Sequence, residues 1–372
     1  MQIFVLGVRG FPNIQGGVEK HCEELYPRLV KFGCKVFVFA RKNYFSLQKR
    51  FKKWKGVKFI YLWCPQIKGL ETFFHTFFGA LICIIKRPDI AHFHNIGPAL
   101  FIPLVKLFKI KTVFTYHSIN YKHQKWGKIA KVVLKLGEWV GVRFADEVIV
   151  VSKTNKKFLE GKYPRKDLRL IFNGINLPKF VESGETLKKY GLQSKKYILA
   201  ICRFAPEKGV YDLIKAYRKI QNPEFKLVIA GDSKYQTNYA KEVKRLAKET
   251  SGVVLTGIVL GKELAELYSN AGLFVLPSYY EGLPIALLEA LSFGLPVLVS
   301  SIPQNKELSL PEFRYFEVGN IEMLAEKMVE LWKRGVSEEE KRIQREMLRE
   351  NYDWNKIALE VLKVYQKTIK RN

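Results

Sequence analysis

The 372-residue sequence lacks the features of several special protein classes. Its five cysteines are scattered and never form a Cys-x-x-Cys pair, so neither a disulfide framework nor a structural zinc site is predicted. The apolar run at residues 73–85 is shorter than the ~20 residues that span a bilayer. The first residues show no basic leader and no small-residue cleavage site. We therefore expect a protein of the reducing cytoplasm.

Acidic residues are scarce in the first half of the chain. Residues 1–180 contain 33 Lys and Arg against 10 Asp and Glu, whereas the remainder contains 30 against 25. Such an excess predicts an anionic partner, and nucleic acid, an anionic membrane surface and a phosphorylated substrate all fit it. Nucleic acid is disfavoured, because the sequence has no zinc-finger pattern, no RNA-recognition motif and no evident recognition helix.

The composition and the order of segments indicate two folded α/β domains. Hydrophobic residues make up 48% and charged residues 26% of a chain that is too long for one ordinary core. Short β-rich runs alternate with helical segments, a pattern typical of parallel sheets. The strands expected in the first half are 3–7, 36–40, 59–63, 90–93, 112–116 and 147–151, and the helices are 17–32, 70–86, 98–108, 126–144 and 153–161.

A second strand series begins near residue 197 and continues at 226–230, 252–255, 273–277 and 296–300. These patterns predict a first domain at 1–176, a polar linker at 177–195 and a second domain at 196–354. The last helices are expected at 337–350 and 355–370. In doubly wound sheets ligands bind beyond the carboxyl ends of the strands, so we expect the site in a cleft between the domains.

The segment most informative about function reads Glu281-Gly-Leu-Pro-Ile-Ala-Leu-Leu-Glu289-Ala-Leu-Ser-Phe-Gly294-Leu-Pro-Val-Leu-Val-Ser300. It predicts a loop, a helix opening at Pro284, a glycine stop and a buried strand. The amides and the positive dipole at such a helix start suit a diphosphate. Glu289 lies in an otherwise apolar helix and needs a partner, which the hydroxyls of a ribose would supply.

This motif resembles that of the retaining, family-4 glycosyltransferases of GT-B architecture, which have two Rossmann-like domains. The resemblance implies that Glu281 faces the sugar of a nucleoside-diphosphate donor and that Glu289 binds the ribose. The residues between them at the loop, Gly282, Leu283 and Pro284, then belong to the donor site. By the same resemblance a C-terminal helix at 355–372 crosses back to complete the first domain, near Trp354.

Two cations follow the first strand of the second domain in the segment Arg203-Phe-Ala-Pro-Glu-Lys208-Gly209. Arginine and lysine at such a turn can bridge two phosphates, the guanidinium by its fork and the ammonium as a point charge. The pair resembles the arginine and lysine with which the family neutralises the leaving diphosphate. No Asp-x-Asp, the carboxylate pair that holds a diphosphate through a divalent ion, occurs in the chain. We therefore expect no metal and no cofactor.

The N-terminal loop reads Gly7-Val-Arg9-Gly-Phe-Pro-Asn-Ile-Gln-Gly16-Gly17-Val-Glu19. It lacks the Gly-x-Gly-x-x-Gly spacing of dinucleotide-binding folds. Gly16 and Gly17 stand just before a helix, where they either let the backbone approach a phosphate or sugar closely or form an ordinary flexible turn. The loop resembles the opening of a bacterial rhamnosyltransferase-like branch of family 4, which implies that Gly16 and Gly17 bind the donor and that Arg9 lines the cleft.

Histidines mark the strand ends of the first domain. His117 resembles the family histidine that hydrogen-bonds the donor sugar, although histidines at strand ends are more often structural. His92 and His94 alternate along a strand and could mimic a metal pair, but no third ligand is evident in the sequence. We interpret His94 and Asn95 as cleft-lining groups and His92 as a packing residue. Ser152, Asn173 and Gly174 also match the family pattern, without an evident chemical role.

These observations and the resemblance together predict a hexosyl- or deoxyhexosyltransferase that moves a sugar from a nucleotide sugar to a glycan or lipid-linked acceptor without a metal, in bacterial-type cell-surface polysaccharide assembly. The resemblance implies that the anomeric configuration is retained. No protein nucleophile is evident. A sugar-nucleotide epimerase or a glycoside phosphorylase of similar architecture is the alternative, and a nucleic-acid-binding protein is a distant one.

The apolar run at 73–85 raises the question of a membrane surface. Cations at Lys68, Lys86 and Arg87 flank it, and Lys106, Lys109 and Lys111 follow further along the chain. One interpretation is peripheral docking on the cytoplasmic face of a membrane, where lysines meet anionic headgroups. The other is a buried Rossmann helix with solubilising lysines around it.

Overall fold

The computed structural model describes residues 1–46, 48, 50–67, 69–122, 127–182, 184–221, 223–233 and 237–371. The chain divides into two compact units, and each is described here by itself. Unit 1 comprises Met1–Gly174 and Trp354–Asn372, and unit 2 comprises Ile175–Asp353. Among the described residues, no helix is both long enough and apolar enough to cross a bilayer.

Unit 1 is built on an eight-stranded sheet with the order β3-β4-β2-β1-β5-β6-β7-β8. β3 pairs antiparallel with β4, and the other described pairs are parallel. The strands are β1 (Gln2–Leu6), β2 (Lys35–Arg41), β3 (Lys53–Trp54), β4 (Val57–Leu62), β5 (Ile90–His94), β6 (Lys111–Tyr116), β7 (Glu147–Val150) and β8 (Arg169–Leu170).

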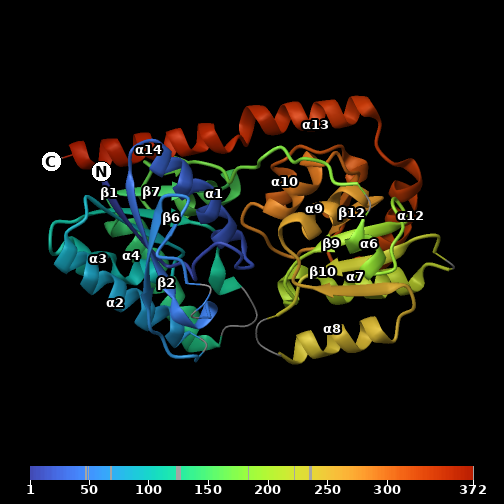
Figure 1. Cartoon of the computed structure of the whole chain (residues 1–372), viewed down its shortest axis with the longest axis horizontal. Helices are drawn as coiled ribbons and strands as arrows, with labels where there is room; N and C mark the ends of the chain where they lie inside the picture. The colour runs from blue at the N-terminus through green and yellow to red at the C-terminus, as the bar shows by residue number, and fades with distance from the viewer. Residues whose placement is uncertain are drawn as a thin grey trace. The chain divides into compact units, whose positions relative to one another are not determined.

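Helices cover both faces of this sheet (Figure 1). They are α1 (Gly17–Lys31), α2 (Leu70–Lys86), α3 (Ile102–Lys106), α4 (Lys128–Phe144), α5 (Lys153–Lys162) and α14 (Trp354–Lys370), with short 3-10 turns at η1 (Lys42–Tyr44), η3 (Pro98–Phe101) and η4 (Asn120–Lys122). α1 and α14 bury one face of the sheet in a common core. α2 and α4 lie on the opposite face, where glycines let them approach closely, Gly79 of α2 beside Leu6 and Gly141 of α4 beside Phe114.

Unit 2 is a six-stranded parallel sheet with the order β11-β10-β9-β12-β13-β14. Its strands are β9 (Tyr197–Ile201), β10 (Lys226–Ala230), β11 (Val253–Gly257), β12 (Leu273–Leu276), β13 (Val297–Ser300) and β14 (Tyr315–Phe316). Its helices are α6 (Glu185–Lys189), α7 (Val210–Lys219), α8 (Asn238–Lys248), α9 (Gly261–Asn270), α10 (Ile285–Ser292), α11 (Pro303–Lys306), α12 (Ile321–Arg334) and α13 (Glu338–Asn351), with 3-10 turns η5 (Pro206–Lys208) and η6 (Glu312–Arg314).

α7, α8 and α12 bury one face of this second sheet in a common apolar core. α9 packs on the other face, where the ring of Tyr268 contacts Phe274 of β12 at a centroid distance of 6.0 Å. Figure 1 shows α9 and α10 on the opposite side of the unit 2 sheet from α7 and α8. Both units are thus three-layer, Rossmann-like α/β folds, as expected.

The segment 177–195 differs from the expected linker. It contains α6 and belongs to unit 2. The carboxylate of Glu266 on α9 accepts hydrogen bonds from the amides of Gly184, at 2.8 Å, and Leu187, at 3.1 Å. The polar composition of this segment therefore does not mark a free linker. It marks an exposed segment whose backbone amides are hydrogen-bonded to α9. Of the other elements, α2 has the expected bounds. The two-residue strands β3 and β8 were not predicted, because so short a run shows no periodic pattern of apolar residues. Trp126, expected to open a helix, lies outside the described residues.

Both sheets have a topological switch point. The strands that come next in the chain are added on one side of the first strand, and later strands are added on its other side. In unit 1 this point lies between β1 and β5, and in unit 2 between β9 and β12. Loops at the carboxyl ends of such strands diverge and leave room for a ligand. Arg9 and Gly16 lie on the loop after β1, Arg203 and Lys208 on the loop after β9, and Glu281 on the loop after β12.

Candidate active site

Two loops of unit 2 meet at its switch point and bring opposite charges together. Lys208 ends η5, after β9, and Glu281 follows β12. Lys208 Nζ lies 2.6 Å from Glu281 Oε1, and Ser278 Oγ donates a hydrogen bond of 2.6 Å to the same oxygen. Both charged side chains are largely buried. The pair is therefore a partly desolvated charge cluster held at the strand ends.

A glycine between these two loops allows their backbones to lie close together. Gly209 has φ +63°, and a Cβ atom added there would lie 2.1 Å from the carbonyl oxygen of Pro277. A side chain is thus excluded both by the left-handed backbone and by the neighbouring loop. Gly209 also precedes α7, so the same residue ends η5 and begins the helix.

Arg203 stands on the same loop as Lys208, half-buried and directly after the buried thiol of Cys202. Burial raises the pKa of Cys202 to about 12, although the charges of Lys208 and Arg203 oppose that shift. Glu281 adds to the rise. The charges of all three groups expected to face the donor therefore act on the pKa of this thiol.

Glu289 lies inside α10 with a protein partner that the sequence did not reveal. Tyr268 of α9 donates a hydrogen bond of 2.9 Å to Glu289 Oε2. The same hydroxyl lies 3.2 Å from the carbonyl oxygen of Ala286. Pro284 is the N-cap of α10, and no side chain of a described residue caps this helix start. Gly282, Leu283 and Pro284 form the turn that connects Glu281 to these amides.

In unit 1 the loop after β1 is closed by a buried ion pair. Arg9 Nη2 lies 2.6 Å from Glu19 Oε2 and Arg9 Nε lies 2.9 Å from Glu19 Oε1, a bidentate arrangement. Burial alone would raise the pKa of Glu19, but the charge and hydrogen bonds of Arg9 hold it below its usual value. Gly16 passes so close that a Cβ atom would lie 2.2 Å from both partners. Arg9 thus fixes the loop that carries Gly16 and Gly17, rather than extending freely to line a cleft.

Three histidines and two tyrosines form a buried hydrogen-bonded chain in unit 1. His117 Nε2 lies 2.9 Å from His94 Nδ1, and Tyr26 bonds the other nitrogen of His94. His92 Nδ1 lies 2.6 Å from the hydroxyl of Tyr365 on α14. His94 is fully buried, so it lies behind His117 and does not line a surface, in contrast to the expectation from sequence. Asn95 is half-buried at the strand end, where its amide nitrogen lies 3.5 Å from the carbonyl oxygen of Gly7.

His21 of α1 packs against this chain, with its ring centroid 5.0 Å from that of His117, and was not singled out by the sequence. One ring nitrogen, Nδ1, donates to the Asn173 side-chain oxygen at 2.9 Å. The other, Nε2, has no hydrogen-bond partner among the described residues. Nitrogens of His21, His94 and His117 lie within 4.8 Å of one another, which supplies the third group that a metal site would need. The sequence could not reveal this grouping because the three residues lie on separate elements.

The surroundings of these rings favour neutral imidazoles. Burial lowers the pKa of His21 to about 4 and that of His92 to about 3. Burial and the neighbouring histidines hold the pKa values of His94 and His117 well below the usual value. Neutral rings can donate from one nitrogen and accept at the other, so this chain can orient His117 as a hydrogen-bonding group.

Three further residues singled out by the sequence have structural roles. Ser152 caps α5 by accepting from the amide of Asn155 at 3.2 Å. A Cβ atom at Gly174 would lie 2.6 Å from the indole of Trp354, so this glycine admits the ring. Trp354 is buried in the core of unit 1, with its ring centroid 5.4 Å from that of His21.

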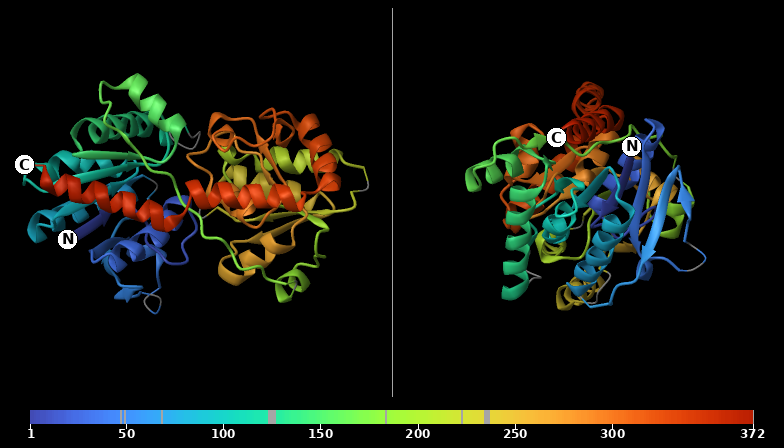
Figure 2. Two further views of the ribbon diagram at one scale, coloured as in Figure 1. Left: turned by 90° about the horizontal axis from the view of Figure 1, so that it is seen from above. Right: turned by 90° about the vertical axis from the view of Figure 1, so that its left-hand side faces the viewer.

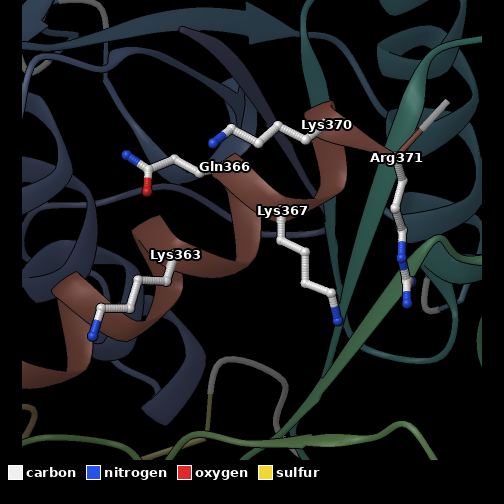
Figure 3. A pocket seen from close by; sticks show the side chains of 5 residues that line it. All are labelled: Lys363, Gln366, Lys367, Lys370 and Arg371. Atoms are coloured by element: carbon white, nitrogen blue, oxygen red, sulfur yellow. The ribbon is translucent and has the colours of Figure 1, made fainter.

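A depression on α14 lies apart from these loops. Figure 3 shows that its lining side chains come from α14 and from Arg371 just after it, with Lys367 and Arg371 extending to the same side. These two cations lie 3.4 Å and 2.8 Å from Glu147 Oε1. The residues that line it are Lys363, Gln366, Lys367, Lys370 and Arg371. We interpret the depression as a charged helix surface whose cations are partly paired.

Comparison with known families covers most of the chain. Residues 15–179 match the family described as Glycosyltransferase Family 4, and residues 183–351 match Glycosyl transferases group 1. A similar curated protein is an uncharacterized glycosyltransferase of Methanocaldococcus jannaschii, 30% identical over 62% of this chain and 62% of that protein. The amylovoran biosynthesis glycosyltransferase AmsD of Erwinia amylovora is 24% identical over 52% of this chain and 53% of that protein. The chain thus matches about half to three fifths of the length of these relatives.

Solved structures show the same fold. Sucrose-phosphate synthase from Thermosynechococcus elongatus has a TM-score of 0.84 at 23% identity, with both chains fully covered. HepE of Anabaena, solved in complex with UDP-glucose, has a TM-score of 0.79 at 15% identity over 99% of this chain and 100% of that one. Residues 15–179 thus match a family 4 glycosyltransferase domain and residues 183–351 a group 1 domain, and the two Rossmann-like units have the GT-B fold of these solved structures.

Proposed function

We propose that this protein transfers a sugar from a nucleoside-diphosphate sugar to a glycan or lipid-linked acceptor. The observation that carries the proposal is the cluster of Lys208, Glu281 and Arg203 at the switch point of unit 2. Cations and helix amides at such a point suit a leaving diphosphate, because both stabilise the charge that grows as the bond breaks. The UDP-glucose bound to HepE is consistent with a nucleotide-sugar donor.

The resemblance of the motifs supports the following donor roles. Arg203 and Lys208 bind the diphosphate, the start of α10 adds amide donors, and Glu281 faces the sugar. Glu289 binds the ribose, and Tyr268 orients its carboxylate through their 2.9 Å hydrogen bond. The ion pair between Lys208 and Glu281 then opens or rearranges when a donor enters, because the ammonium must turn toward phosphate.

The acceptor approaches over unit 1, where His117 serves as a donor-sugar ligand. The anomeric configuration is retained, and the leaving phosphate takes the proton of the acceptor, so no protein nucleophile is assigned. The reaction proceeds without a metal. Chelation by EDTA tests this point: full activity is expected to survive, whereas loss restored by zinc would assign a metal to His21, His94 and His117. Restoration by magnesium or manganese instead would indicate a metal on the diphosphate.

The biological setting is bacterial-type cell-surface polysaccharide assembly in the cytoplasm or on the cytoplasmic face of a membrane. The motif at residues 9–19 favours the rhamnosyltransferase-like branch, and the similarity to an amylovoran biosynthesis glycosyltransferase fits a polysaccharide role. A strongly basic first half fits a surface that meets anionic headgroups or a phosphorylated acceptor.

Two experiments test the function. Nucleoside diphosphates and sugar nucleotides are screened for thermal stabilisation, since a ligand that binds the folded state alone raises the unfolding temperature. The stabilising donor is then incubated with candidate acceptors and the products are analysed. A new glycosidic linkage supports the transferase. An isomerised sugar nucleotide indicates an epimerase, and a sugar phosphate formed from a glycan and phosphate indicates a phosphorylase.

A further inference from the structure

Helix α4 presents its large apolar side chains outward instead of toward the sheet. Ile129 is 83% exposed, Val132 65%, Leu136 47% and Trp139 45%. Together with Val133 they recur at intervals of three or four residues, which places them on one side of a helix. We call these five residues the α4 stripe. An exposed apolar stripe of this length is unusual on a protein surface without a partner.

Small residues explain why the helix packs with this orientation. Gly137 and Gly141 form part of the buried side of α4. A Cβ atom at Gly137 would lie 2.1 Å from the carbonyl oxygen of Ile96, and one at Gly141 would lie 2.7 Å from the ring of Phe114. The sheet-facing side is thus too tight for large side chains. Rotating the helix to bury the stripe would create collisions, so the exposure is built into the packing.

Neighbouring helices carry further exposed apolar side chains. α3 contacts both α2 and α4, and the right-hand view of Figure 2 shows the three on one side of unit 1. Leu107, just after α3, is 79% exposed, and Ile85 near the end of α2 is 74% exposed. The expected apolar segment at 73–85 therefore contributes to this surface, although α4 carries the larger share. Lys68, one of its expected flanking cations, lies outside the described residues.

The charge around the stripe is of one sign. Lys128, Lys131 and Lys135 accompany it along α4, and the sequence contains no Asp or Glu between residues 90 and 137. The first acid beyond, Glu138, is fully buried and bonded to Tyr116, Tyr163 and Lys162. An apolar stripe with a tryptophan and bordering lysines is the pattern of a helix that lies in the surface of an anionic bilayer.

The position of the stripe links it to the candidate site of the same unit. α4 follows the loop after β6, so its N-terminal end, with Ile129, lies toward the carboxyl ends of the strands. This is the edge of the unit 1 sheet at which His117 and Asn95 follow β6 and β5. We infer that the α4 stripe and its lysines dock unit 1 on an anionic lipid surface, so that an acceptor anchored in that bilayer presents its headgroup to this edge. This inference rests on the proposed function for the acceptor, but the docking itself does not.

Vesicle co-sedimentation tests the docking without any activity assay. The full-length protein is mixed with pure phosphatidylcholine vesicles and with mixed phosphatidylcholine–phosphatidylglycerol vesicles. We expect binding to the mixed vesicles that weakens as salt rises. The Ile129→Ser/Leu136→Ser variant should lose most of it. Lys128→Gln/Lys131→Gln/Lys135→Gln should lower the partition coefficient by about fivefold for each charge removed.

Matched controls change exposed residues of the same types elsewhere. Ile343→Ser/Leu359→Ser removes apolar side chains of α13 and α14, and Lys241→Gln/Lys248→Gln/Lys262→Gln removes three exposed cations of unit 2. Both should bind vesicles like wild type, and all variants should keep the wild-type unfolding temperature.

Three results would overturn the inference. The first is that equal amounts of protein sediment with neutral and anionic vesicles, or that none sediments with either. The second is that the α4 variants bind vesicles like wild type. The third is that an α4 variant turns a dimer into a monomer while its vesicle binding is unchanged. The last would assign the stripe to a second copy of the chain. Donor binding in the absence of vesicles is measured alongside, so that a failure of the transferase proposal is recognised separately.

Discussion

At the scale of single residues, we expect the Lys208–Glu281 pair to couple stability to catalysis. Lys208→Ala leaves the largely buried carboxylate of Glu281 with Ser278 as a remaining donor. We expect the free energy of unfolding to fall by about 1–3 kcal/mol, because a buried charge loses its partner. Turnover should fall by about a hundredfold or more, since one contact to the developing diphosphate charge is typically worth ~3 kcal/mol.

The double variant Lys208→Met/Glu281→Gln separates the two effects. It removes both charges, so stability should return toward wild type while turnover stays low. Arg203→Ala should slow turnover to a similar extent with a smaller change in stability. The assigned roles fail if Lys208→Ala and Arg203→Ala both turn over at the wild-type rate in steady-state assays.

Glu289 and Tyr268 should act as one unit in nucleotide binding. Glu289→Gln is expected to weaken the affinity for the free nucleoside diphosphate, whereas Glu281→Gln and His117→Ala should mainly impair transfer. Tyr268→Phe removes the hydroxyl that orients Glu289 and should raise the Kd by about fivefold, the value of one hydrogen bond of ~1 kcal/mol. Isothermal titration with the stabilising nucleotide measures all four variants. An equal loss of affinity in the three acid and histidine variants would mean that their roles are wrongly divided.

The buried histidines make unit 1 sensitive to acid. His21 is neutral in the fold, with its pKa lowered from 6.5 to about 4 by burial. Below pH 6.5 the unfolded chain takes up this proton before the folded one, so the free energy of unfolding falls as the pH drops toward 4. Urea unfolding of wild type and His21→Asn across this range isolates the contribution. The variant should be less stable near neutral pH but show a shallower decline, and parallel curves would exclude His21 as a source of the effect.

At the scale of elements, Gly209 should hold the two donor loops together. Gly209→Ala places a methyl group 2.1 Å from the Pro277 carbonyl oxygen and strains a backbone with φ +63°. Gly261→Ala is the matched control, because its φ is +59° but no atom lies within 4 Å of the added Cβ. We expect Gly209→Ala to cost about 1–3 kcal/mol more in unfolding free energy than the control. It should also weaken nucleotide affinity, and similar losses in both variants would exclude the loop contact.

Pattern and periodicity predicted the elements better than their orientation. The apolar run bounded by Gly69 and Arg87 predicted α2 with its observed bounds, and the Glu281 motif predicted the loop, helix and strand around α10. The outward direction of the α4 stripe was missed. Periodicity shows that a helix has an apolar side, but here Gly137 and Gly141 decide which side faces the sheet, and their role depends on contacts with Ile96 and Phe114.

Contacts between distant elements were also beyond the sequence. Tyr268 meets Glu289 across two helices, and His21 meets His94 and His117 from a different layer. Each pairing depends on how elements stack, which local pattern does not encode. By contrast, Lys208 and Glu281 were each singled out from a local motif on the loop after a strand, Lys208 after β9 and Glu281 after β12. Their mutual ion pair follows from the adjacency of β9 and β12.

At the scale of the whole molecule, the chain passes between the units twice at one place. Ile175 donates its amide to the carbonyl oxygen of Tyr352 at 2.7 Å, and Gly174 adjoins Trp354. A protein made of residues 1–174 joined by a short glycine linker to 354–371 should therefore fold on its own. Circular dichroism and cooperative urea unfolding measure this. Residues 1–174 alone should not unfold cooperatively, because α14 supplies Trp354, Ile357 and Val361 to the core of unit 1.

The path of the chain also sets the order in which the molecule can be completed during synthesis. Unit 2 is one continuous stretch, whereas the core of unit 1 needs α14, which is made after all of unit 2. During synthesis on the ribosome, the apolar surface of unit 1 that α14 covers must therefore stay exposed until the rest of the chain has emerged. A chain that stalls or is truncated before α14 would expose this apolar surface of unit 1 although unit 2 is complete. Such a product would be a natural substrate for chaperones that bind apolar surface.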